Sequence, residues 1–148
     1  MPHFTLNIDV RGPVVNAQIN VSEGRRTALE VQNTAIPPPR VVRALIDTGA
    51  SFSSVEPTVL ASLGLTPTGT IDFVTPSTGQ AVVTTDTYDV DVVIYKGPND
   101  PPLSMPNLRV AACQLFLRQG IHALIGRDIL SKCVLIYNGE VNMFTLAF

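Results

Sequence analysis

The stretch "VRALIDTGASFSSVE", residues 42–56, joins an apolar run directly to an acidic residue, Asp47. A carboxylate at the end of a buried strand is costly unless another group uses or compensates it. A structural Asp would cap a helix or close a turn. The next helix candidate begins only at Pro57, too far along the chain for capping, and a turn Asp needs no Thr-Gly-Ala after it. We therefore interpret Asp47 as a functional carboxylate.

The segments before this stretch have strand patterns. Apolar and polar residues alternate in "HFTLNIDV" (3–10) and in "VVNAQINV" (14–21), and together they predict an N-terminal hairpin. We expect a further strand in "TALEVQN" (27–33) and another in "VVRALI" (41–46). Three consecutive prolines at 37–39 indicate a loop between them.

The segments after Asp47 predict a mostly-β chain with two short helices. Pro57 near the start and Gly64 near the end of "EPTVLASLGL" are typical of a helix. Asn138-Gly139 predicts a type I′ turn in a C-terminal hairpin. The remaining expectations are two β arms around "TPSTG" (70–97), a proline-rich loop (98–107), strands at 108–117 and 122–125, a helix within 126–133 and the hairpin at 134–148.

A short repeat links the two halves of this region. "RALIDTGAS" and "HALIGRDIL" share "ALI", and in both an apolar strand runs into a glycine-containing turn. A short helix is expected after each turn. The repeat is a weak indication of a duplicated half-domain, since Ala-Leu-Ile is also a common composition.

Composition excludes several classes of function. The chain has 148 residues and a net charge of −2, and its basic residues are scattered, so we expect no nucleic-acid partner. The sequence has neither an apolar run long enough to span a bilayer nor a signal peptide, which predicts a cytoplasmic protein without a membrane partner. Cys113 and Cys133 lack metal-site spacing and are expected to be buried thiols, and we expect no metal or other cofactor.

Three features together resemble the retroviral-type (retropepsin-like) aspartic proteases. They are "ALI" followed by Asp47-Thr48-Gly49-Ala50, a hairpin with Gly79 at its tip, and "LIGRDIL" around Gly126. The resemblance covers residues 41–148, and residues 1–40 would be an N-terminal extension forming strands within a single domain of residues 1–148. It implies a closed acid-protease barrel with two short helices and a flap hairpin.

The resemblance also implies roles for individual residues. Asp47 would be catalytic, on an active-site loop with Thr48, Gly49 and Ala50. The Thr48 hydroxyl would link two such loops across a dimer. The tentative substrate-binding residues are Ser51, Thr75, Ser77, Gly79, His122 and Leu124, and Gly126, Arg127 and Asp128 would form a structural brace. His122 could instead be a partly exposed histidine at a strand end without a functional role. Asp128 could instead be a helix N-cap.

The brace is where this sequence departs from the family. In retroviral enzymes the arginine after the glycine pairs with an acid at the position that Ser51 occupies here. A serine cannot form that ion pair, so we expect a different brace, with Asp128 or Glu56 as candidates.

The number of Asp-Thr-Gly motifs predicts the oligomeric state. Hydrolysis without a metal or a protein nucleophile needs one group that activates water and one that protonates the leaving amide. Two close carboxylates supply both, because they do not ionise together easily. This chain has one Asp-Thr-Gly, and Gly126 stands where a second catalytic Asp would be, so a homodimer is expected, with Asp47 from each copy.

The sequence thus predicts an aspartic endopeptidase that cleaves extended peptide or protein substrates. The alternative is a catalytically inactive dimeric β domain that serves as a peptide-binding or scaffold module. Retention of Asp47 with Thr48 and Gly49 favours the enzyme.

Overall fold

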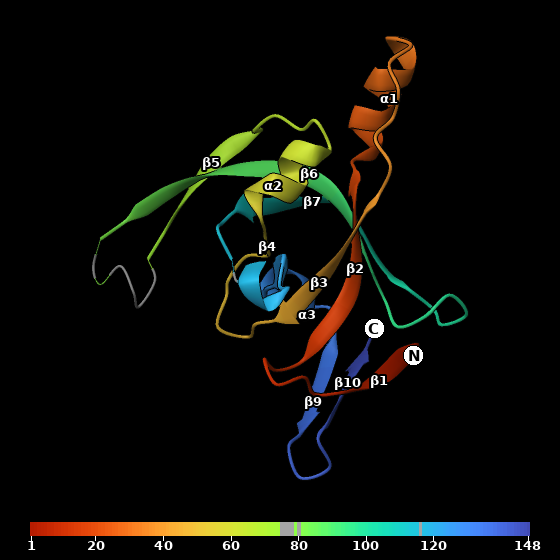
Figure 1. Ribbon diagram of the computed structural model, residues 1–148, viewed down its shortest axis with the longest axis vertical. Coiled ribbons are helices and arrows are strands. Elements are labelled where there is room, and N and C mark those ends of the chain that lie inside the picture. Colours follow the sequence, from red (N-terminus) through yellow and green to blue (C-terminus); the bar gives the residue numbers. More distant parts are fainter. Residues whose placement is uncertain (75–78, 80, 116) are drawn as a thin grey trace.

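Six strands of the computed structural model close into a barrel (Figure 1). The structure describes residues 1–74, 79, 81–115 and 117–148. Along the chain the described elements are β1 (His3–Asn7), β2 (Val14–Val21), α1 (Glu23–Val31), β3 (Arg40–Ile46), β4 (Ser54–Val55), α2 (Pro57–Ser62), β5 (Gly69–Phe73), β6 (Val83–Tyr95), β7 (Leu103–Ala112), the 3-10 helix η2 (Leu117–Gln119), β8 (Ala123–Ile125), α3 (Arg127–Leu130), β9 (Val134–Asn138) and β10 (Met143–Ala147).

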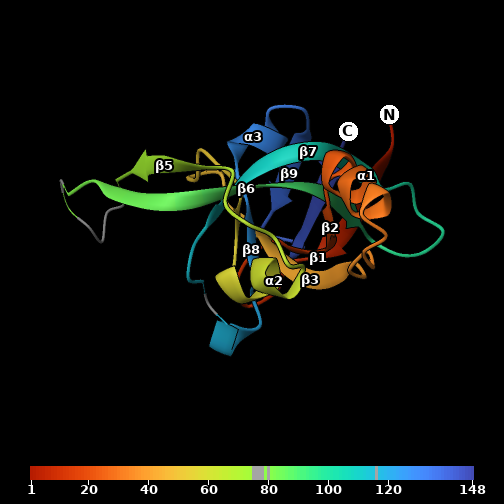
Figure 2. The same ribbon diagram turned by 90° about the horizontal axis from the view of Figure 1, so that it is seen from above.

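The strand order explains how the barrel closes. Neighbouring strands follow the order β2-β3-β8-β4-β7-β6, and β2 also pairs with β6, which joins the two ends. The β3–β8 and β4–β7 pairs are parallel, whereas the other pairs are antiparallel. Within the described part of the chain, β5 pairs with β6 alone, and the β5–β6 hairpin projects away from the barrel in both views (Figures 1 and 2).

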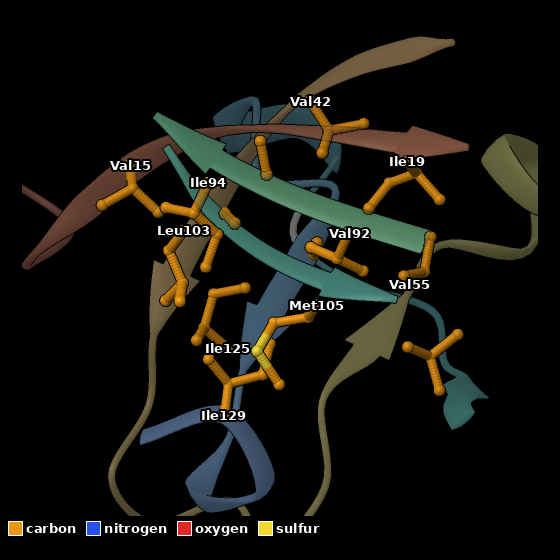
Figure 3. Close-up of a cluster of buried hydrophobic side chains, with 14 of the residues drawn as sticks. Val15, Ile19, Val42, Val55, Val92, Ile94, Leu103, Met105, Ile125 and Ile129 are labelled. Atoms are coloured by element: carbon orange, nitrogen blue, oxygen red, sulfur yellow. The ribbon is translucent and has the colours of Figure 1, made fainter. Parts of the chain in front are cut away.

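The core fills the barrel with branched aliphatic side chains. Figure 3 shows Val15, Val42, Ile94 and Ile125 from different strands pointing toward one another. Burying each such side chain contributes about 1.5–3 kcal/mol. Ile129 of α3 is completely buried in the same cluster, so the short helix after β8 is anchored on the barrel.

The two ends of the chain lie together in a second, three-stranded sheet of order β1-β10-β9 (Figure 1). β1 pairs antiparallel with β10, and Phe4 packs edge-to-face on Phe148 with 5.9 Å between the ring centroids. The predicted N-terminal hairpin is therefore wrong. Residues Asp9 to Gly12 do form a tight turn, but the strands on either side enter different sheets. Alternation in the sequence indicates strands without specifying their partners.

The predicted strand at 27–33 is also wrong, because α1 covers most of this segment. Ser22 caps the helix, its hydroxyl accepting a hydrogen bond from the Arg25 backbone N–H at 3.3 Å. Glu23 in the first turn suits the positive end of the helix dipole. Only Leu29 of α1 is buried, so the apparent apolar alternation of Leu29 and Val31 does not reflect a half-buried strand.

Two predicted boundaries near β7 are corrected. The proline-rich loop at 98–107 is shorter than expected, because β7 already begins at Leu103. Pro106 is tolerated because it lies at an irregularity, where pairing with β6 shifts between Val90 and Val92. The strand expected at 108–117 ends at Ala112.

The C-terminal hairpin is confirmed, but its turn is not the predicted type I′ turn. β9 ends at Asn138 and β10 starts at Met143, so the loop holds residues 139–142. The positive φ of 54° falls on Asn142 rather than on Gly139. The Asn138 side chain accepts hydrogen bonds from the backbone N–H groups of Glu140 and Val141 at 3.1 and 3.3 Å, which stabilises the longer loop.

Candidate active site

The two "ALI" segments of the sequence lie side by side. Ala44, Leu45 and Ile46 of β3 pair in parallel register with residues 123–125 of β8. The Asp47 backbone N–H donates to the Ile125 carbonyl at 3.0 Å. The carboxyl ends of these strands therefore bring Asp47 and Gly126 to the same edge of the barrel. Gly126 directly follows β8, at the position that corresponds to Asp47 directly after β3.

The loop after β3 orients the Asp47 carboxylate. The Gly49 backbone N–H donates to Asp47 Oδ1 at 2.9 Å, and the Ala50 N–H donates to the Asp47 carbonyl at 3.2 Å. A Cβ atom on Gly49 would lie 3.1 Å from Asp47 Oδ1, so glycine leaves this carboxylate oxygen uncrowded. Asp47 is half-buried, while Thr48 and Gly49 are exposed. The carboxylate is thus fixed in direction but open to a ligand.

Arg127 ties the loop after β8 to the Asp47 loop. Its Nη1 donates to the Thr48 and Gly49 carbonyls at 3.0 and 3.4 Å, and its Nη2 donates to Ser51 Oγ at 2.8 Å. Its backbone N–H adds a bond of 2.9 Å to the Ala50 carbonyl. Backbone carbonyls and a hydroxyl therefore take the place of the acid that the family pairs with this arginine. In the described part of the chain, Arg127 forms no ion pair.

A second set of bonds holds the same two loops through Asp128. Its carboxylate accepts from the Ser53 backbone N–H at 2.9 Å and from Ser53 Oγ at 2.7 Å. Ser53 Oγ in turn accepts from the Gly126 N–H at 3.0 Å. Asp128 lies inside α3, whose N-cap is Gly126, so it is not the N-cap of that helix. Ser53 is 2% exposed, so these bonds are shielded from water.

Gly126 is required by the close crossing of the loops. A Cβ atom there would lie 2.6 and 2.7 Å from the Phe52 carbonyl carbon and oxygen, and 2.9 Å from the Ser53 nitrogen. All three are backbone atoms, which cannot move aside as a side chain can. The glycine lets the two backbone segments cross in direct contact.

The other candidate for the brace, Glu56, serves a different segment. Its buried carboxylate accepts from the Leu115 backbone N–H at 2.6 Å. This bond joins the start of α2 to the connection between β7 and β8. Glu56 therefore anchors the segment before η2 and does not bind Arg127.

The remaining predicted substrate-binding residues are placed as follows. His122 immediately precedes β8, with its backbone carbonyl bonded to the Glu56 N–H at 2.9 Å. Leu124 is half-buried and, by strand alternation, faces away from the core side chains of Ala123 and Ile125. Gly79 is exposed with φ +64° between the β5 and β6 arms. Thr75 and Ser77 lie outside the described residues.

Sequence analysis did not single out Phe52 and Ser53. Phe52 is 46% exposed directly after the Asp47 loop, and Ser53 joins both loops. For Phe52, the sequence signal was an aromatic residue close to the Asp-Thr-Gly motif. A serine carries no such signal, since its role depends on Asp128, which is 75 residues away in the chain.

The described residues lack the features of two other classes of function. They contain no group of three or more His, Cys, Asp or Glu side chains placed to hold a metal ion. Cys113 and Cys133 are free and half-buried. No helix in the described part of the chain has the length and apolar character needed to cross a membrane.

A sequence model of the aspartyl protease family matches residues 38–129, which contain both loops and both strands of the site. The chain belongs to this family. The match extends over more than half of the sequence, and it identifies the protein as an aspartic peptidase.

Comparison with solved structures supports the same fold. The structure is similar to that of a retropepsin-like aspartic protease from Rickettsia conorii, with a TM-score of 0.57 and 14% sequence identity. The alignment covers 99% of this chain and 90% of that one. No curated protein matches the sequence significantly. The predicted family, enzyme class and retropepsin-like barrel are confirmed, with α1 as an additional helix.

Proposed function

We propose that this aspartic peptidase is an endopeptidase that acts as a homodimer, with Asp47 of each copy forming one catalytic pair. The observation that carries the proposal is the position of Gly126. The β3–β8 pairing puts a glycine, without any side chain, where the second half of the repeat would supply a carboxylate. A second copy of the chain is the remaining source of a matching Asp47.

The chemistry follows from two carboxylates that share one proton, as is well established for aspartic proteases. The ionised carboxylate takes a proton from water while the water oxygen attacks the peptide carbonyl carbon. The protonated carboxyl stabilises the oxygen of the resulting tetrahedral intermediate. Proton transfer to the amide nitrogen then lets the C–N bond break. The Gly49 N–H, bonded to Asp47 Oδ1, would keep each carboxylate correctly directed during these steps.

The three-stranded terminal sheet offers a surface for the second copy. Val134, Ile136 and Met143 share one of its faces and are 48%, 57% and 36% exposed. The strands β9 and β10 contain no charged residue, and β9 is an edge strand, with one side unpaired among the residues that the structure describes. Natural proteins usually protect such edges with charge or proline, and an unprotected apolar edge favours pairing with another chain. β9 also follows directly from α3, which begins in the loop carrying Arg127.

The proposed substrate is an extended peptide that lies between the Asp47 loop and the β5–β6 hairpin. Main-chain hydrogen bonds to a strand-like peptide would provide affinity, and pockets would select side chains. The hairpin projects from the barrel, as a flap over the substrate requires (Figure 2). Ser51, Gly79, His122 and Leu124 remain proposed contacts of this substrate.

The first experiment is cleavage of a proteome-derived peptide library between pH 4 and pH 7, with new termini identified by mass spectrometry. The wild-type protein should cleave and the Asp47→Asn variant should not, because the variant loses the group that activates water. Activity should favour mildly acidic pH, because the mechanism needs one protonated and one ionised carboxyl group in the pair. Cleavage by neither protein, in a sample shown to be dimeric, would favour the peptide-binding alternative.

A mixing experiment tests whether two copies share the site. When wild-type and Asp47→Asn chains are mixed in equal amounts and allowed to exchange, about one quarter of the dimers carry both aspartates. Activity per total chain should therefore drop to about one quarter of the wild-type value rather than to one half. A drop to one half, or full activity of wild-type chains diluted until they are monomeric, would contradict a shared site.

A further inference from the structure

A cavity of about 230 Å³ lies at the base of the β5–β6 hairpin, next to the Asp47 loop. This is smaller than the roughly 300–1,000 Å³ of typical small-molecule sites, and suits one amino-acid side chain. The residues lining it come from the loop before β4 and from three strands: Phe52, Thr70, Ile71, Thr87, Arg109, Val110 and Ala111. The Ala111 N–H donates to the Ser53 carbonyl at 3.0 Å, which fixes the cavity to the loop of the active site.

The cavity wall contains a buried polar group without a partner. Thr87 is 2% exposed, and its Oγ1 has no hydrogen-bond partner in the described part of the chain. Gly69, opposite Thr87 in the β5–β6 pair, leaves space beside the hydroxyl, because a Cβ atom there would lie 3.2 Å from Oγ1. Buried polar groups in proteins are almost always hydrogen-bonded, so an exception needs an explanation. Since this hydroxyl has no hydrogen-bond partner in the described part of the chain, its O–H can point toward a ligand without breaking an existing bond.

Arg109 adds a second donor at the mouth of the cavity. Its side chain is 64% exposed, and its Nε contacts Asp89 Oδ1 at 3.3 Å. That contact uses one of the five N–H donors of the guanidinium. Apart from Thr70, the other lining residues are apolar: Phe52, Ile71, Val110 and Ala111. A matching side chain would thus have an apolar stem and an oxygen acceptor at its end.

We propose that this cavity is a specificity pocket that selects a substrate side chain ending in a carbonyl or carboxylate oxygen, namely glutamine or glutamate. The inference rests on the proposed peptidase function. Thr87 would donate to the terminal oxygen, and Arg109 would favour glutamate over glutamine by its charge. Methionine has a similar length but no such oxygen, so it would leave the hydroxyl unpaired. Sites built to hydrogen-bond a substrate group reject analogues that lack it.

The test compares peptides that carry glutamine, glutamate or methionine in turn at each position around the cleaved bond. The wild-type protein should prefer glutamine to methionine at one position by at least about 10-fold in kcat/KM. The Thr87→Val variant keeps the shape of the side chain, and its preference at that position should disappear. The Arg109→Gln variant should retain the preference for glutamine but lose about 2–5-fold of the preference for glutamate. Thr27→Val, on exposed α1, is the matched control and should leave the profile unchanged.

A binding measurement separates this inference from the proposed function. In Asp47→Asn protein with labelled methyl groups, the Thr87 and Ile71 signals should shift with a glutamine peptide and much less with its methionine analogue. This readout needs no cleavage, so it remains valid if the protein does not cleave these peptides. Equal shifts with both peptides, or a Thr87→Val profile identical to that of the wild type, would overturn the pocket. Loss of cleavage selectivity in the Thr27→Val control would do the same.

Discussion

At the scale of single residues, Gly126 controls how closely the two site loops cross. Gly126→Ala should lower the free energy of unfolding by about 1–3 kcal/mol or more, because its Cβ would overlap backbone atoms of Phe52 and Ser53. Gly24→Ala is the matched control, since nothing lies within 4 Å of the added Cβ and the site is inside α1. That substitution should stabilise the protein by about 0.5–1 kcal/mol. Urea unfolding of both variants measures the difference, and equal effects of the two would contradict the crossing.

Ser51 stands at the position where the resemblance to retroviral-type aspartic proteases predicts an acid. Ser51→Asp would place a carboxylate beside Arg127 Nη2, which now bonds Ser51 Oγ at 2.8 Å. We expect the free energy of unfolding to rise by up to about 1 kcal/mol, because the pair is exposed. Ser51→Ala should lower it by about 1 kcal/mol through loss of the hydrogen bond. Thermal unfolding at low and high salt checks both, since only the gain from Asp should shrink with salt.

At the scale of elements, the sequence predicted those whose signals are local. Pro57 and Gly64 defined α2, and β-rich segments on either side of a turn cluster identified the two arms of the β5–β6 hairpin. Strand partners were missed where they depend on distant parts of the chain, as with β1, which pairs with β10. The α1 segment was misread because Leu29 and Val31 imitate strand alternation, while the Ser22 cap that decides for a helix was not considered.

The turn between β1 and β2 makes a pH-dependent contribution to stability. The Asp9 carboxylate accepts a hydrogen bond from the Arg11 backbone N–H and contacts the Arg11 and Arg43 side chains, which together lower the pKa of Asp9 below its ordinary value of 3.8. A lowered folded-state pKa stabilises the protein above pH 3.8, and this contribution is lost as the pH falls through the folded-state pKa.

Asp9→Asn should therefore be less stable than the wild type near neutral pH, and the difference should shrink as the solution is acidified below pH 3.8. Denaturant unfolding at several pH values measures it. The Glu140→Gln variant, in the exposed loop between β9 and β10, is the control and should show no such trend. A difference between Asp9→Asn and wild type that grew on acidification would contradict the assigned cause.

At the scale of the whole molecule, the Asp47 loop and Gly126 lie at the same edge of one barrel. The resemblance predicted that the segment of Gly126 would brace the Asp47 loop, and the parallel pairing of β3 with β8 places Asp47 and Gly126 together. The sequence could not reveal the bonds from Asp128 to Ser53 or the unpaired Thr87 hydroxyl, because both depend on how distant loops pack. It also cannot show which surface receives the second copy. The exposure and charge of side chains in the folded protein are needed to infer that surface.

The terminal sheet makes the proposed assembly testable without changing the Asp47 loop. Ile136→Lys places a charge on the uncharged edge strand β9, where the side chain is 57% exposed, so folding should be little affected. We expect the variant to sediment as a monomer at concentrations where the wild type is a dimer, and to lose peptidase activity in parallel, because a like charge would face its copy across the interface. Val31→Lys is the control, because Val31 is also exposed to solvent and lies on α1 at the other end of the molecule; this variant should remain dimeric and active (Figure 1). An Ile136→Lys variant that stayed dimeric and active would place the interface elsewhere, whereas a variant that was monomeric yet active would show that one Asp47 is sufficient.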